Sequence, residues 1–82
     1  MTNVQNACVL LINELYKKEP VGGELHIVTD DFNVSDSDLA WCEHYIKQQG
    51  KENTATGKLE LAILWILAMM TEEEREECAF NA

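Results

Sequence analysis

Basic residues are scarce in this chain. Its 82 residues include 6 Lys and Arg against 15 Asp and Glu, which gives a formal net charge of -9. Binding to nucleic acid depends on Lys and Arg that neutralise phosphates, and an anionic membrane surface attracts polybasic segments. The composition therefore predicts no nucleic-acid and no membrane partner, and it favours a protein partner with a basic surface.

Long apolar runs, proline and a full set of cysteines are lacking as well. The longest apolar run, residues 61–70, is shorter than the roughly 18 residues that cross a bilayer. Three cysteines, Cys8, Cys42 and Cys78, cannot complete a disulfide framework within one chain. The first residues lack the basic start of a signal peptide. With one Pro, four Gly and 46% hydrophobic residues, we expect a single globular domain over residues 1–82, located in the cytoplasm.

Apolar residues recur at helical spacing in three stretches. The first predicted helix covers about 3–18 and ends before the sequence Glu19-Pro20. The second covers about 36–49, with Ser35 as its cap and Gly50 at its end. The third covers about 58–70, after a polar connection at 51–57.

Two shorter elements complete the predicted fold. Thr71 and Glu74 match a capping box, which predicts a short helix through about residue 78 or 80. Residues 25–29 are partly β-branched and lie between turn formers, so they predict a strand or an extended segment. The fold class is therefore mostly α: a small bundle of three main helices and a short C-terminal helix, with one extended segment near 25–29.

The helix predicted at 58–70 is apolar on every side. Such a helix favours burial all round, yet a domain of this size barely surrounds one. Either it is a central core helix, or part of it forms an interface between two copies of the chain. For a homodimer of this kind, the expected self-association residues are Ile63, Trp65, Ile66 and Met69.

Acidic residues form two clusters. One lies within residues 30–38, and the other runs from Glu72 to Glu77 around the single Arg75. The pairs Glu72–Glu76 and Glu73–Glu77 are four residues apart and repel by roughly 0.2–0.5 kcal/mol each. Either the clusters are solvated helix faces, or they form a surface that binds the basic surface of a partner in the place of nucleic acid. The candidate partner-binding residues are Asp30, Asp31, Asp36, Asp38, Glu72, Glu73, Glu76 and Glu77.

Patterns for metal binding and catalysis are incomplete. A calcium loop that starts at Asp31 would need Gly and Glu at its sixth and twelfth positions, where Asp36 and Cys42 stand. There is no C-x-x-C pair for zinc, no nucleophile elbow and no complete phosphate-binding loop. We therefore expect no enzyme, no resident metal and no cofactor. The alternative that stays open is a non-catalytic ligand or metal site within 26–36, centred on His26, Asp30, Asp31 and Asn33.

One segment has a recognisable pattern. Residues 25–33 read L-H-I-V-T-D-D-F-N and are followed by Asp36, Trp41 and Cys42. This resembles an L-H-I-V-x-D-D-G-N motif of small bacterial and phage proteins that have no established activity, with Phe32 in place of the glycine. The resemblance implies a phage or mobile-element origin and no catalytic residues. With the charge, it predicts a small acidic protein-binding module that inhibits host machinery by presenting acidic residues to a basic surface.

Overall fold

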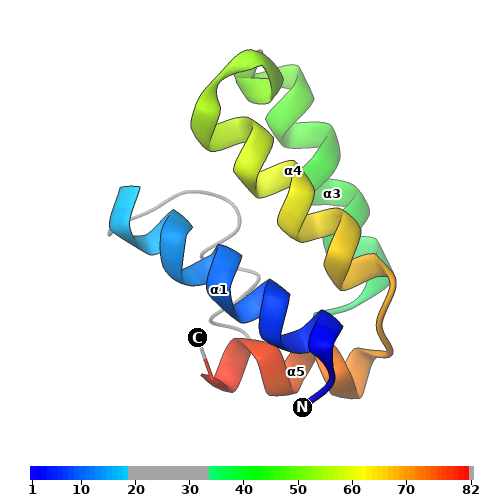
Figure 1. The fold of residues 1–82 in the computed structure, drawn as a ribbon. Helices are drawn as coiled ribbons and strands as arrows, with labels where there is room; N and C mark the ends of the chain where they lie inside the picture. Colours follow the sequence, from blue (N-terminus) through cyan, green and yellow to red (C-terminus); the bar gives the residue numbers. More distant parts are fainter. Residues whose placement is uncertain (19–33, 82) are drawn as a thin grey trace.

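The computed structural model describes residues 1–18 and 34–81, and only the backbone of 79–81. Within these ranges the chain forms four α-helices and one 3-10 turn, and no strand (Figure 1). The elements are α1 (Asn3–Lys18), α3 (Asp36–Gln48), η1 (Lys51–Asn53), α4 (Ala55–Ala68) and α5 (Glu72–Asn81). The mostly helical class is confirmed. The extended segment predicted at 25–29 lies outside the described residues.

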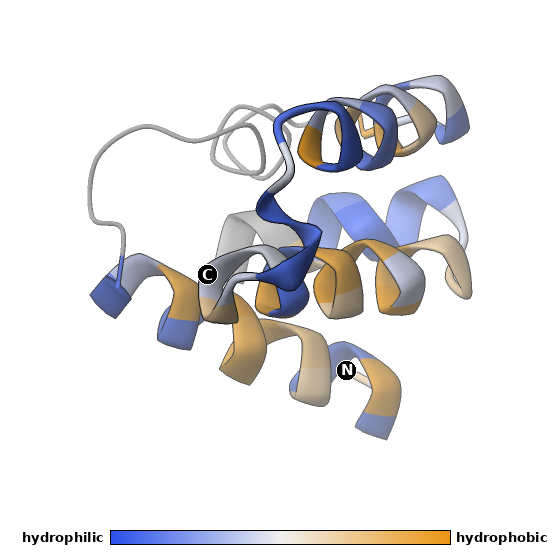
Figure 2. Cartoon of the chain, turned by 90° about the horizontal axis from the view of Figure 1, so that it is seen from above, coloured by the Kyte–Doolittle hydropathy of each residue, from blue (hydrophilic) through white to orange (hydrophobic). Residues whose placement is uncertain are grey.

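Helix α4 is the centre of the bundle. It packs against α1 on one side and against α3 on the other, while α1 also packs against α5 (Figure 1). Viewed from above, α1 alternates between hydrophobic and hydrophilic residues along its length (Figure 2), as an amphipathic helix does. The hydrophobic core lies between the helices. Its largest fully buried apolar side chains are Ile12, Leu15, Ile46, Ile63 and Leu67.

Helix α3 begins and ends at the predicted signals. The Ser35 hydroxyl accepts a hydrogen bond from the Asp38 backbone N–H at 3.2 Å, and the Asp38 carboxylate accepts one from the Ser35 backbone N–H at 3.0 Å. This capping box pairs two backbone donors that the helix itself leaves without partners. Gly50 follows the helix with a φ of 71°, a left-handed conformation that glycine adopts without steric cost.

Helix α4 begins at Ala55, three residues earlier than the periodicity predicts. The reason is a cap at Thr54, whose hydroxyl accepts a hydrogen bond from the Gly57 backbone N–H at 2.9 Å. Gly57 is therefore helical rather than part of a polar connection. A Cβ atom at this position would lie 1.8 Å from the Lys51 carbonyl oxygen, so the close approach of η1 to α4 requires glycine.

Helix α5 also begins as predicted. The Thr71 hydroxyl accepts from the Glu74 backbone N–H at 3.2 Å, and the Glu74 carboxylate accepts from the Thr71 backbone N–H at 3.0 Å. Cys78 turns towards the core and is fully buried. Across the described part of the chain, every helix is too short or too polar to cross a membrane.

Candidate binding surfaces

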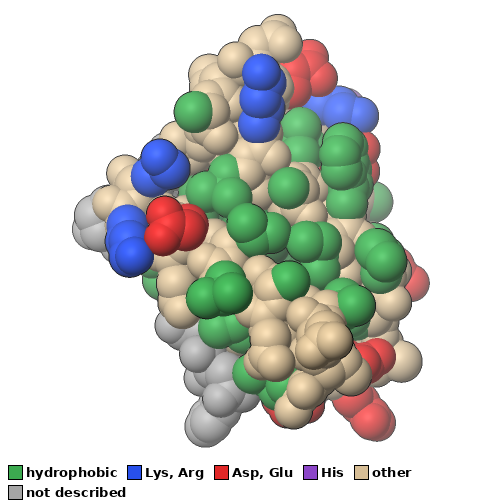
Figure 3. All heavy atoms as spheres, in the orientation of Figure 1, with side chains coloured by type: hydrophobic (Ala, Val, Ile, Leu, Met, Phe, Trp, Pro, Cys, Tyr) green, Lys and Arg blue, Asp and Glu red, His purple; other side chains and the backbone are tan. Residues whose placement is uncertain are grey.

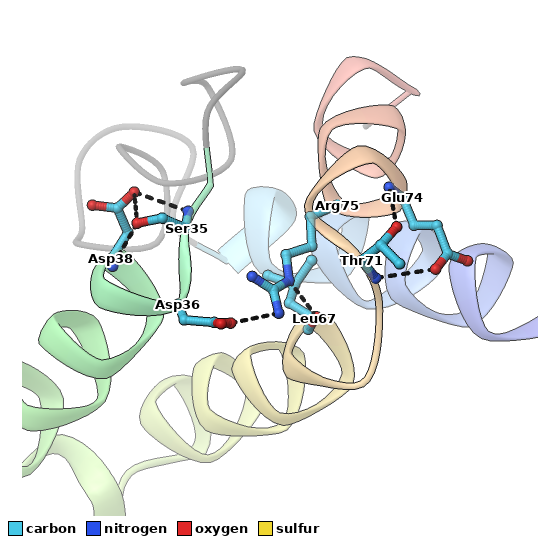
Figure 4. A network of polar contacts seen from close by, with 7 residues as sticks. All are labelled: Ser35, Asp36, Asp38, Leu67, Thr71, Glu74 and Arg75. Atoms are coloured by element: carbon cyan, nitrogen blue, oxygen red, sulfur yellow. Dashed lines mark hydrogen bonds and ion pairs between the residues drawn. The ribbon is translucent and has the colours of Figure 1, made fainter.

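The two acidic clusters meet through an ion pair. Arg75 in α5 donates from Nη2 to the Asp36 carboxylate at 2.7 Å and from Nε to the Leu67 carbonyl oxygen, also at 2.7 Å (Figure 4). The Arg75 side chain is 4% exposed, whereas the Asp36 side chain is 86% exposed. Arg75 therefore points into the bundle and joins the start of α3 to the last turn of α4, where the carbonyl ends of the helix dipole favour a cation.

The ion pair brings carboxylates from α3 and α5 to the same end of the molecule, which we call the acidic end. Its members are Asp36, Asp38, Glu72, Glu73, Glu74, Glu76 and Glu77. Arg75 is the only cation of α5, and its charge is already matched by Asp36. Figure 3 shows Asp and Glu side chains at its lower right margin without Lys or Arg beside them, whereas the Lys and Arg side chains at its upper and left margins have other Asp and Glu side chains next to them. The acidic side chains at the lower right therefore lie apart from the lysines, two of which pair with Glu14 and Glu43 elsewhere on the molecule.

Some of the predicted partner-binding residues have structural contacts. Besides its bond to the Ser35 backbone, Asp38 accepts from the Ser35 hydroxyl at 2.9 Å. Glu77 accepts from the Gln5 side-chain amide of α1 at 3.1 Å. These bonds fix the ends of helices and the contact between α1 and α5, so the two carboxylates contribute to the fold as well as to the charge.

Three of the predicted residues remain available at the surface. Glu72, Glu73 and Glu76 are exposed, and none forms a hydrogen bond or an ion pair with another described residue. Asp30 and Asp31 lie outside the described residues, as do His26 and Asn33 of the alternative site. The structure thus places six of the eight predicted partner-binding residues, and Glu72, Glu73 and Glu76 are exposed without such contacts.

The four expected self-association residues do not share one environment. Ile63 is fully buried in the core, so it offers no surface to a second copy, and its expected role is corrected. Ile66 is half-buried and packs against the core. Trp65 and Met69 are 59% and 75% exposed. The all-apolar helix is therefore a core helix on one side only, because its described neighbours α1, α3 and η1 leave Trp65 and Met69 exposed.

Among the described residues, three polar side chains are buried without any signal in the sequence. Gln5, Glu60 and Arg75 are each at most 4% exposed. Gln5 bridges α1 to α5, because its amide group contacts Glu77 and the Glu74 carbonyl oxygen. Polar residues at core positions break the apolar periodicity on which helix faces are predicted. Only the tertiary contacts of these residues explain their burial.

The cysteines are free, buried thiols. Burial, followed by the neighbouring Cys78, raises the pKa of Cys8 to about 12, and burial also raises the pKa of Cys78. Both thiols are therefore protonated at neutral pH, and a protonated thiol is a poor nucleophile. Among the described residues, no three His, Cys, Asp or Glu side chains come together as metal ligands.

No protein-family model matches the chain, and neither a curated protein nor a solved structure matches it.

Proposed function

We propose that this chain is a small, non-catalytic, cytoplasmic protein-binding module whose acidic end docks on a basic surface of a partner protein. One observation supports the proposal above the others. Carboxylates from two helices converge on one end, where the only cation of α5 is buried and already paired. Carboxylates arranged in this way attract the Lys and Arg side chains that otherwise neutralise phosphates.

More specifically, we propose that the chain is a phage or mobile-element inhibitor that competes with nucleic acid for binding to host machinery. Its contacts would be made by the exposed Glu72, Glu73 and Glu76. Asp36 would contribute as well, since its side chain remains 86% exposed while it pairs with Arg75. A mimic of this kind binds mainly through charge, so its affinity falls as salt screens the exposed pairs.

The test is affinity capture from host lysate at low and high salt, with bound proteins identified by mass spectrometry. The variant Glu72→Gln/Glu73→Gln/Glu76→Gln removes three charges from the acidic end. The matched control, Glu14→Gln/Glu43→Gln/Glu52→Gln, removes three charges from other elements. Both variants change the net charge equally, so non-specific attraction to basic proteins weakens equally in both.

The expected result is a stoichiometric basic partner that is lost from the first variant, retained by the control, and displaced by double-stranded DNA. A partner that binds all three proteins equally would contradict the proposal. A partner that DNA fails to displace would contradict the mimic form alone. The alternative, a ligand or metal site at 26–36, predicts binding that is nearly independent of salt and is lost on His26→Ala.

A further inference from the structure

The exposed face of α4 carries a lysine at its start and apolar side chains along its middle, and two carboxylates follow the helix in the sequence. Lys58, Ala62, Trp65 and Met69 follow one another at intervals of three or four residues, which places them on one side of the helix. Lys58, Trp65 and Met69 are exposed and Ala62 is half-buried. Glu72 and Glu73 begin the next helix.

We propose that this face pairs with the same face of a second copy in antiparallel orientation, so that Lys58 of each copy lies against Glu72 and Glu73 of the other. The two-fold axis then passes near Trp65, which lies about midway between Lys58 and Glu72 in the sequence. In such an isologous pair each contact occurs twice.

Charge complementarity identifies the occupant and its orientation. The Lys58 ammonium group is exposed and forms no ion pair with another described residue. Lys58 and Met69 are separated by about 16 Å along the helix axis, from a rise of 1.5 Å per residue. When the α4 helices of the two copies run in opposite directions, each lysine lies opposite the other copy's carboxylates. A parallel pair would instead bring like charges together, which disfavours that arrangement.

The apolar middle of the face supplies the contact area. Trp65 and Met69 are among the most exposed large hydrophobic side chains of the described residues, and aromatic side chains and Met are enriched in interfaces. Hydrophobic side chains also continue across this side of the molecule over α1 and α4 (Figure 3). A typical interface covers about 800 Å² per copy, which is about a sixth of the 4854 Å² that the chain exposes.

This pairing does not rest on the binding proposed for the acidic end. The two share Glu72 and Glu73, so a basic partner would compete with the second copy, but either interaction can exist without the other. Self-pairing is measured on the purified chain alone. A negative result in the lysate experiment therefore leaves the pairing unaffected, and the reverse also holds.

The test is sedimentation equilibrium of the full chain, whose monomer has a mass of 9.3 kDa, over concentrations from about 1 to 200 μM. We expect a reversible monomer–dimer equilibrium. Trp65→Gln and Met69→Gln should each raise the dimer Kd by about tenfold or more. The matched controls Trp65→Phe and Met69→Leu keep the face apolar and should keep the dimer. Circular dichroism verifies that every variant is folded.

Charge reversal tests the orientation. Lys58→Glu alone, or Glu72→Lys with Glu73→Lys, should raise the dimer Kd by about three- to tenfold, and the triple variant should restore it. Lys47→Glu in α3 makes the same change of net charge away from this face and should leave the Kd unchanged. A monomer at every concentration, or a dimer that Trp65→Gln leaves intact, would overturn the proposal. A dimer insensitive to Lys58→Glu would overturn the antiparallel orientation.

Discussion

The Arg75 guanidinium and the Asp36 carboxylate lie 2.7 Å apart, and they join two acidic segments that are almost forty residues apart in the sequence. The pair is asymmetric, because Arg75 is buried and Asp36 is exposed. The Nη1 atom of Arg75 is buried and has no hydrogen-bond partner in the described structure. The contribution of this pair to stability therefore depends more on Arg75 than on Asp36.

Substitution of Arg75 tests this asymmetry. Arg75→Ala removes the bond to the Leu67 carbonyl oxygen together with the buried stem of the side chain, so it should destabilise the fold by about 2–4 kcal/mol. Arg75→Met refills the space without a buried charge and should cost less than Arg75→Ala. Urea unfolding of the three proteins measures the difference. An equal loss of unfolding free energy in Arg75→Ala and Arg75→Met would contradict this explanation.

The exposed partner should matter less. Asp36→Asn keeps an oxygen that accepts a hydrogen bond from Arg75, so it should lower the free energy of unfolding by only about 1 kcal/mol. Lys47→Ala breaks the exposed ion pair with Glu43 and serves as the surface reference, with an expected cost below about 1 kcal/mol. A larger loss for Asp36→Asn than for Arg75→Ala would show that the exposed member of the pair dominates.

The start of α4 should be sensitive to small changes. Gly57→Ala places a methyl group against the Lys51 carbonyl oxygen, which either separates η1 from α4 or strains both, at an expected cost of about 2–4 kcal/mol. Thr54→Ala removes the cap and should cost about 1 kcal/mol. Thermal unfolding should compare both variants with Ala55→Gly, a substitution at an exposed position in the first turn of α4. This control is expected to lower the free energy of unfolding by about 1 kcal/mol or less. An unchanged melting temperature for Gly57→Ala would refute the close contact.

The two faces of α4 should respond differently to truncation. Ile63→Ala creates a cavity in the core and should cost about 2–5 kcal/mol. Trp65→Ala removes a side chain that is 59% exposed and should cost about 1 kcal/mol or less in the monomer. Measurement at low protein concentration keeps self-association out of the comparison. Similar losses at both positions would contradict the assignment of Ile63 to the core and Trp65 to the surface.

Stability should fall at alkaline pH because of Cys8. Its pKa rises from 9.0 in the unfolded chain to about 12 in the fold, so the unfolded chain releases the proton at lower pH than the folded one. The contribution of Cys8 is therefore fully present below about pH 9 and is lost as the pH rises towards 12. The free energy of unfolding, measured from about pH 8 to about pH 11, should fall more steeply in the wild type than in Cys8→Ala. Parallel curves would refute the prediction.

Within residues 1–18 and 34–81, the sequence by itself determined which segments are helical and where most of them begin and end. Ser35 and Thr71 were identifiable as caps because a helix end leaves backbone donors that a nearby hydroxyl accepts, and that chemistry is local. The span of α1 was predictable for a similar reason, since one amphipathic face needs no knowledge of its partners. The start of α4 was predicted three residues too late, because the Thr54 cap includes a glycine, which is usually read as a helix breaker.

Only the tertiary structure decided which side of each helix is available. Ile63 and Trp65 are both large apolar residues of one helix, and their different exposure depends on where α1 and α3 pack against α4. Likewise, the sequence shows two acidic clusters, but their meeting at one end depends on an arginine that turns inward between three helices. Local patterns specify helices because hydrogen bonds and caps act over a few residues. Surfaces form from side chains that are distant in sequence, so only packing assembles them.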